Sequence, residues 1–220
     1  MKKKLILIKN FNNHFNSQNF NLCALNLAFL SYLLSKKIGL KKNLYLWNDG
    51  LLGKIFSKQN KLPGSQLLSF FYKYKYKHIL VIGNCNKNDK NYLRKKFKTK
   101  IIVKKIPYIK IGKLKKINIF LKKNTLTLIT LPTPKQEILA TKLVSINKNY
   151  KIICIGGGLA IASGTIKRCP HFLYILGLEF LWRLKTDTLR RVSRLISNIL
   201  TFFFHFLFTN EFSKYSIIIK

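Results

Sequence analysis

Short apolar runs, each ending in glycine, asparagine or proline, recur along this chain and constrain its fold more than any other feature. Such runs lie at Leu44–Trp47, Ile79–Ile82, Leu126–Leu131 and Lys151–Ile155. Helical patterns separate them, as at 135–147 between the last two runs. Strands that alternate with helices need crossover connections, which give parallel pairing. The sequence therefore predicts an α/β protein with a Rossmann-like, largely parallel sheet and flanking helices.

The two ends of the chain differ from its middle. Residues 2–9 are basic and then apolar, which predicts a first strand, and Leu22–Leu34 is apolar nearly all round, which predicts a buried helix. From Phe172 onward the pattern turns helical, with a second helix expected at Leu189–Phe208. We therefore divide the chain into an α/β domain at 1–185 and a basic, apolar C-terminal appendage at 186–220.

The charge of the chain is far from balanced. Of its 220 residues, 42 are Lys or Arg and 6 are Asp or Glu, which gives a net charge of +36. An anionic partner is expected, but nucleic acid, an anionic membrane and a phosphate-bearing substrate would each fit. No run reaches the roughly 20 apolar residues that span a bilayer, so a spanning protein is not expected.

The cysteines and histidines carry no metal-binding pattern. The four cysteines lack paired C-x-x-C spacing and lie mostly in apolar runs, which predicts buried reduced thiols. The four histidines form no cluster with the spacing of metal ligands. We expect neither a metal site nor a cofactor.

Polar and glycine residues follow several of the predicted strands. Asp49 follows one strand, Gly83 and Asn84 another, and Thr133 and Gly156–Gly158 two more. Active sites of open α/β sheets gather at the carboxyl ends of strands. Turns of this kind can direct backbone N–H groups at a diphosphate, and Gln136, just inside a helix, can donate and accept hydrogen bonds. These residues form the candidate substrate site.

Three linked motifs extend this pattern. They are Pro132-Thr133-Pro134-Lys135-Gln136-Glu137 followed by the glycines at 156–158, then Gly164-Thr165-Ile166-Lys167-Arg168-Cys169-Pro170, then Gly177-Leu178-Glu179-Phe180-Leu181-Trp182-Arg183-Leu184. In order and spacing they resemble the WecG/TagA/CpsF glycosyltransferase family. The resemblance covers roughly 19–194 and is closest after Leu131.

The resemblance implies an activity. Members of this family move a sugar, often of the N-acetylhexosamine type, from a UDP-sugar to a lipid-diphosphate-linked acceptor in glycan biosynthesis. The chain is therefore expected to be an inverting, metal-independent enzyme that acts at an anionic membrane surface, with a possible homo-oligomer and no nucleic-acid partner. Its appendage is expected to contact that membrane, because a basic stretch there leads into an aromatic-rich apolar helix.

The resemblance also implies roles for single residues. Asp49, in Asn48-Asp49-Gly50, matches the aspartate thought to be the general base, and Asn21 is the closest match to an upstream substrate-binding asparagine. Arg168 stands where an arginine beside the phosphate loop is expected. Arg183, Arg190 and Arg194 match arginines that contact the leaving group or the membrane.

Departures from the family pattern leave two alternatives open. Asn19 stands where threonine is usual, and Gln66 stands where an acid is usual. A family member that has lost catalysis is one alternative. The other is a basic nucleic-acid-binding protein, for which the alternating run Tyr72–Lys77 is the candidate motif. Abundant Lys, Asn, Ile and Phe indicate an AT-rich genome, and so a mitochondrion or else the cytoplasmic face of a bacterial membrane.

Overall fold

The described residues form an α/β structure around one parallel sheet. The computed structural model describes residues 2–8, 11, 15, 19–35, 44–58, 60–106, 111–114, 116–176, 179, 182 and 188–220, with only the backbone for 51, 52, 57, 175 and 188–191. Within these residues the sheet has eight strands in the order β5-β4-β6-β7-β2-β3-β1-β8, and every neighbouring pair is parallel. The expected Rossmann-like fold is confirmed.

The strand bounds follow most of the predicted apolar runs. The strands are β1 (Lys3–Leu7), β2 (Phe20–Leu25), β3 (Leu44–Asn48), β4 (His78–Ile82), β5 (Lys100–Lys104), β6 (Thr125–Ile129), β7 (Lys151–Ile153) and β8 (Tyr215–Ile219). Strands β2, β4, β6 and β7 are almost fully buried because helices cover both faces of the sheet.

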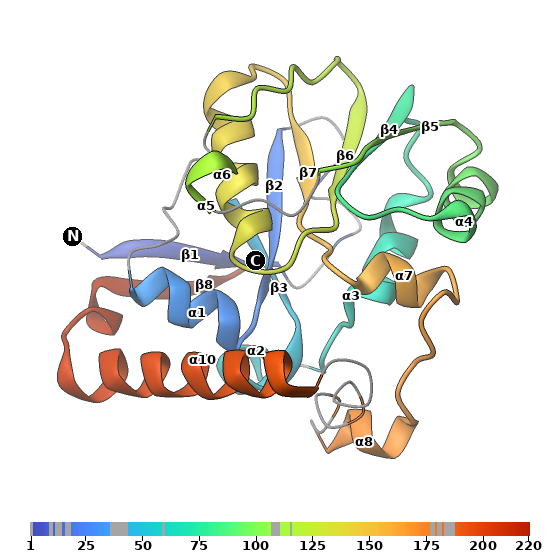
Figure 1. Ribbon diagram of the computed structural model, residues 1–220. Helices are drawn as coiled ribbons and strands as arrows, with labels where there is room; N and C mark the ends of the chain where they lie inside the picture. The colour runs from blue at the N-terminus through green and yellow to red at the C-terminus, as the bar shows by residue number, and fades with distance from the viewer. Residues whose placement is uncertain are drawn as a thin grey trace.

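Two layers of helices cover the sheet (Figure 1). Helices α1 (Leu27–Leu34), α5 (Ile111–Leu114), α6 (Lys135–Ile146) and α10 (Thr188–Phe208) supply buried side chains to one core. Helix α3 (Gly64–Leu67), the 3₁₀ helix η1 (Leu68–Phe71), α4 (Lys87–Phe97) and α7 (Gly158–Ala162) supply the core on the other face. Helices α2 (Gly50–Ser57) and α8 (His171–Ile175) follow β3 and α7, and the 3₁₀ helix η2 (Phe212–Lys214) precedes β8.

The helix predicted at Leu22–Leu34 is only half correct. The segment up to Leu25 is strand β2, and the helix begins at Leu27. Asn26 divides the two, because its side chain accepts a hydrogen bond from the Phe29 N–H at 3.0 Å and caps α1. A strand buried on both faces is apolar throughout, so it resembles a buried helix in sequence.

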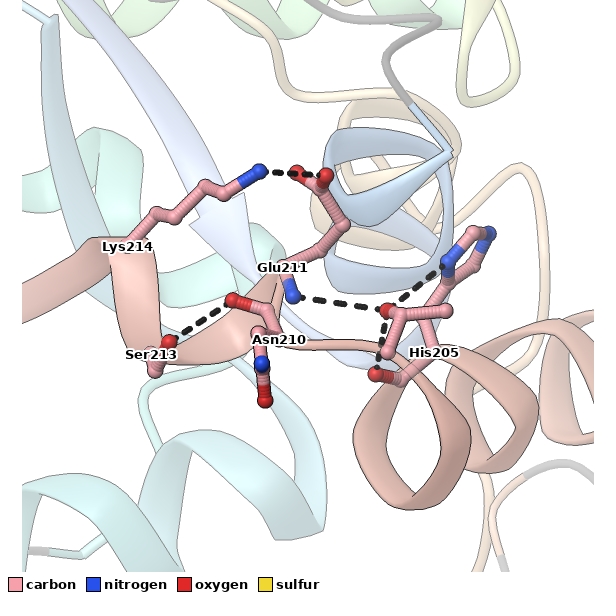
Figure 2. A network of polar contacts seen from close by, with 6 residues as sticks. His205, Asn210, Glu211, Ser213 and Lys214 are labelled. Atoms are coloured by element: carbon pink, nitrogen blue, oxygen red, sulfur yellow. Dashed lines mark hydrogen bonds and ion pairs between the residues drawn. The ribbon is translucent and has the colours of Figure 1, made fainter.

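The C-terminal segment returns to the sheet after α10. In Figure 1, α10 lies beside α1 along the lower side of the view, and the two helices are packed together. Figure 2 shows the turn that follows, in which Lys214 pairs with Glu211. The two charged atoms lie 2.6 Å apart, and Thr209 Oγ1 donates to the His205 carbonyl at 2.8 Å. Strand β8 then pairs with β1 along its whole length. The division at residue 185 stays a prediction, and in the described residues no helix has the length and apolarity to cross a membrane.

Candidate active site

The carboxyl ends of β4, β6 and β7 lie side by side, which brings three predicted turns together. Ile82 pairs with Ile129, and Leu128 pairs with Ile153, so the chain leaves three adjacent strands at one edge of the sheet. Helix α4, after β4, and helix α6, after β6, cover opposite faces. Ligands of open α/β sheets bind where such helices diverge. The turns at this point contain Gly83, Asn84, Thr133 and Gly156–Gly158.

The turn after β4 requires glycine. Gly83 has φ of +116°, and a Cβ there would lie 2.7 Å from Thr130 Oγ1. That hydroxyl donates to the Asn84 carbonyl at 2.8 Å and so ties the β4 turn to the end of β6. The Asn84 side chain is exposed at this edge.

A buried polar network opens α6. Gln136 Nε2 donates to Thr133 Oγ1 at 3.2 Å and to Glu137 Oε1 at 2.9 Å, and Thr133 Oγ1 donates to the same Glu137 oxygen at 3.0 Å. Gln136 is 4% and Glu137 2% exposed. Burial raises the pKa of Glu137 to about 7, against the lowering effect of hydrogen bonds from Gln136, its own backbone and Thr133. The network fixes the orientation of the Gln136 amide.

The Gln136 amide is aimed at the turn after β7. A Cβ on Gly156 would lie 3.6 Å from Gln136 Oε1, and Gly156 has φ of +54°. Gln136 Oε1 is buried and accepts no hydrogen bond from the described protein. The N–H groups of Gly156 and Gly158 already donate to the Ile129 and Ile155 carbonyls, and Gly157 is the exposed member of the turn. Gln136 therefore offers an acceptor to a ligand bound over this turn.

The turn at Gly64 packs on the turn at Gly158, and the residue after Gly64 forms a hydrogen bond with Arg168. A Cβ on Gly158 would lie 3.0 Å from the Gly64 carbonyl carbon, so α3 and α7 meet through two glycines. This contact places Ser65, whose hydroxyl accepts a hydrogen bond from Arg168 Nη2 at 3.1 Å. Arg168 is otherwise exposed, so its charge is available to a ligand at this edge.

Asp49 lies at the carboxyl end of β3, in the same part of the edge as Tyr174. It precedes Gly50, which has φ of +84°, and its side chain does not cap α2. The pKa of Tyr174 rises to about 12 because of burial first and then the negative charges of Asp49 and Glu179, while Arg168 opposes the shift. These charges therefore act on one small region. Lys61 also belongs to it, because its ammonium lies 4.5 Å from the centre of the Tyr174 ring.

Asn26 belongs to this edge, and sequence reasoning missed it. It follows β2, next to β3, and a Cβ on Gly50 would lie 3.7 Å from the Asn26 Cβ. An asparagine directly before a helical apolar run is typical of an N-cap, which is the signal that could have located it.

Asn21, by contrast, lies inside the protein. It is 2% exposed, near the start of β2, where its Oδ1 lies 3.7 Å from Cys23 Sγ and 3.9 Å from Cys154 Sγ. Both thiols are free and buried, and burial raises their pKa values. The structure therefore does not bring Asn21 to the edge turns, and its role in substrate binding stays a prediction.

Asp89 holds the loop that leads to Arg168, and the sequence analysis did not foresee this. Asp89 Oδ2 accepts from the Asn86 N–H at 3.0 Å, and Asn86 Oδ1 accepts from the Asp89 N–H. These two hydrogen bonds form a capping box at the start of α4. Asp89 Oδ1 accepts from the hydroxyls of Ser163 and Thr165. The Asn-x-x-Asp spacing predicts the cap, but nothing in the sequence predicts the bonds across to the 163–165 loop.

The three arginines predicted for the leaving group or membrane are only partly described. Arg183 lies outside the described residues, as does the side chain of Arg190. Arg194 is exposed on α10. The described residues contain no group of three or more side chains suited to bind a metal ion.

A comparison with protein families decides which family this site belongs to. The model of the glycosyl transferase WecG/TagA/CpsF family matches residues 51–216. The chain is a member of this family. A comparison with curated proteins found no match.

The part of the chain that matches the WecG/TagA/CpsF family contains much of the carboxyl edge of the sheet. The matched residues include the turns after β4, β6 and β7, Arg168 and α10. Asp49, Asn21 and Asn26 precede the match. Asp49 and Asn26 lie at the edge because they follow β3 and β2, whereas Asn21 is buried and its role stays a prediction. The family transfers glycosyl groups in glycan biosynthesis, with sugar donor and acceptor substrates.

Proposed function

We propose that this protein moves an N-acetylhexosamine-type sugar from a UDP-sugar to a lipid-diphosphate-linked sugar, with inversion at the anomeric carbon. The observation that supports the proposal is that one carboxyl edge of the sheet carries Asp49, Arg168, the start of α6 with Gln136 and the turn at Gly156. That edge offers a candidate base, a cation and the polar groups of the turns after β4, β6 and β7. Transfer to an acceptor hydroxyl needs these three components.

The donor nucleotide binds over β4, β6 and β7 in this proposal. Gln136 Oε1 is a buried acceptor without a protein donor in the described structure, and uracil has an N–H that can donate to it. Gly156 carries no Cβ, which would lie 3.6 Å from Gln136 Oε1, so the approach to this acceptor stays open, while Gly83 permits the β4 turn beside it. Asn84, Thr133, Gly157 and Gly158 line the same turns.

Asp49 acts as the general base. Its carboxylate takes the proton of the acceptor hydroxyl as that oxygen bonds to the anomeric carbon. The bond from that carbon to the diphosphate breaks on the opposite face, and UDP leaves with the electron pair. Arg168 stabilises the departing diphosphate in this proposal, and Arg183, Arg190 and Arg194 are candidates for the same task or for lipid headgroups.

Helix α10 supplies the membrane contact in this proposal. Its inner face packs on α1 through Phe202, and Ser31 Oγ donates to Asn198 Oδ1 at 3.0 Å. Its outer face exposes large apolar side chains, namely Ile196, Leu200, Phe203, Phe204, Leu207 and Phe208. An exposed apolar face beside basic residues suits a helix lying in an anionic interface. A peripheral membrane location follows, while a mitochondrial or bacterial origin and an oligomer stay predictions.

The test compares the protein with Asp49→Asn and Gln136→Ala. Turnover of UDP-sugars with a lipid-diphosphate acceptor is measured, together with calorimetric binding of UDP. We expect Asp49→Asn to lose at least about a hundredfold in kcat while UDP still binds, because only proton transfer is removed. Gln136→Ala should instead weaken UDP binding. Equal turnover in Asp49→Asn and the parent rejects Asp49 as base, and UDP binding without turnover indicates a non-catalytic family member.

A further inference from the structure

The amino-terminal edge of the sheet, opposite the active site, carries a row of lysines. These lysines lie just before or at the first residue of four adjacent strands, β5, β4, β6 and β7, and most of them are exposed. The row, called the amino-edge lysines below, comprises Lys75, Lys77, Lys98, Lys100, Lys122, Lys123, Lys148 and Lys151. Hydrogen bonds join the strand starts, because Thr99 Oγ1 donates to the Lys77 carbonyl at 2.8 Å and the Lys77 N–H donates to the Asn124 carbonyl at 3.0 Å.

No described acid lies at this edge of the sheet. Asp49, Asp89 and Glu137 lie at the opposite edge, Glu179 lies beyond α8, and Glu211 precedes β8 at the far end of the sheet. A shallow hollow of about 510 Å³ lies beside the row, lined by Lys90, Arg94, Lys98, Thr99, Lys100 and Ile101. The edge is therefore a cationic surface with room for an anionic group.

The tyrosines of the run Tyr72–Lys77 do not face this surface. Tyr76 is 7% exposed, and the Tyr72 ring packs edge-on against Phe97 at 5.0 Å. Lys73, Lys75 and Lys77, between and after them, are exposed. The alternation of the run therefore places rings inside and ammonium groups outside, and the tyrosines are not stacking platforms for nucleic-acid bases.

Phe120 is a described aromatic side chain that does face solvent here. It is 81% exposed, two residues before Lys122, whereas Ile119 is buried. Asn147 holds the backbone on both sides of it: Asn147 Nδ2 donates to the Ile119 carbonyl at 3.0 Å, and Asn147 Oδ1 accepts from the Leu121 N–H at 2.7 Å. These two hydrogen bonds fix the loop so that Phe120 faces solvent. An exposed ring adds nothing to the core, so packing does not explain this orientation.

We propose that this edge binds single-stranded nucleic acid, with the amino-edge lysines on phosphates and Phe120 stacked on a base. Four strands spaced ~4.8 Å apart place cations along roughly 14 Å, long enough to follow successive phosphates of a single strand. An aromatic ring within a cationic groove is typical of sequence-tolerant binding to single strands. The edge lacks the continuous apolar face of α10 that would favour a bilayer. This proposal differs from the sequence-based expectation of no nucleic-acid partner.

The first experiment places a fluorescent probe at the stacking position with Phe120→Trp. Oligo-uridine and oligo-deoxythymidine are titrated separately, and anionic vesicles serve as the membrane arm. We expect both strands to quench the new tryptophan, because a base stacks on it, and the arm that binds more tightly identifies RNA or DNA. Phe120→Ala should weaken binding about fivefold to 150-fold, the range for loss of one stacked base. A blue shift with vesicles and no quenching by either strand overturns the proposal in favour of a membrane.

The second experiment removes charge from the edge. The variant with Lys75→Gln, Lys77→Gln and Lys100→Gln is compared with a control that loses three equally exposed lysines elsewhere, Lys54→Gln, Lys113→Gln and Lys116→Gln. The slope of log binding constant against log salt should fall by about two in the first variant only, since each phosphate contact contributes about 0.7. Equal losses in both variants indicate attraction by net charge alone and overturn the site. Neither variant should change glycosyl transfer.

Discussion

At the scale of single residues, Glu137 is a carboxyl group whose protonation the fold controls. Its pKa is raised by burial to about 7 from an ordinary 4.5, so the folded protein holds a proton that the unfolded chain has lost between these values. The stability that depends on this proton is therefore complete below about pH 4.5 and is lost as the pH rises to about 7. We expect the free energy of unfolding to fall by about 3 kcal/mol more across this range in the parent than in Glu137→Gln.

Urea unfolding at a series of pH values measures this difference. Glu137→Gln keeps an oxygen that can accept from Thr133 and Gln136, so the network persists without the titration. Other groups change stability with pH in both proteins, and subtraction removes them. A difference that does not vary between about pH 4.5 and 7 would mean that Glu137 has an ordinary pKa in the folded protein.

Sequence reasoning located residues whose role depends on their own strand and missed those whose role depends on a distant partner. Gly83 and Gly156 each follow an apolar run, so their place at the carboxyl edge could be predicted. Asn147 could not be assigned, because its bonds run to main-chain groups 26 and 28 positions away. Asp89 likewise reaches residues 74 and 76 positions away.

At the scale of helices and strands, β6 could be predicted from its own residues, whereas β2 and β8 could not. The run that forms β6 is bounded by turn residues on both sides, which identifies it without its neighbours. Strand β2 merges with α1 into one apolar run, and only Asn26 marks the boundary. Strand β8 lies in the segment assigned to the appendage and is defined by pairing with β1, about 210 residues earlier in the chain. Parallel pairing over such a distance leaves no local signal.

Helix α10 has an inner and an outer face, and two neighbouring phenylalanines separate their roles. Phe202 is 6% exposed in the core with α1, whereas Phe203 is 51% exposed. Phe202→Ala should lower the free energy of unfolding by about 3–5 kcal/mol, the range for replacing a buried phenylalanine by alanine. Phe203→Ala should change stability by less than about 0.5 kcal/mol but weaken binding to anionic vesicles about tenfold.

Thermal unfolding and vesicle flotation together check this pair. The informative comparison is Phe203→Ala, because it folds like the parent. If Phe203→Ala floats with vesicles as well as the parent does, the outer face of α10 is not the membrane contact. If it unfolds as readily as Phe202→Ala, then α10 packs through its outer face in solution.

At the scale of the whole molecule, most of the described acids gather at one edge of the sheet, and the cations are spread over the surface. Asp49, Asp89 and Glu137 all lie at the carboxyl edge of the sheet. Among the described side chains, the Lys214–Glu211 pair is an ion pair within 4 Å, and it lies in the turn before β8 (Figure 2). Even with every acid paired, the net charge of +36 would remain without a counter-charge in the chain. Such a surface repels itself and attracts polyanions at either edge.

This self-repulsion predicts that salt stabilises the isolated protein. Raising NaCl from about 0.01 M to about 0.15 M shortens the Debye length from about 30 Å to about 8 Å, which screens lysines on different strands from one another. Because the unfolded chain spreads the same charge over a larger volume, the folded state gains more from screening, and Tm should rise by several degrees. Sodium sulfate at equal ionic strength separates screening from anion binding. Equal shifts in Tm with the two salts indicate screening. A larger shift in Tm with sulfate indicates an occupied anion site such as the amino-edge lysines. A constant Tm would mean that the charges lie too far apart to act on folding.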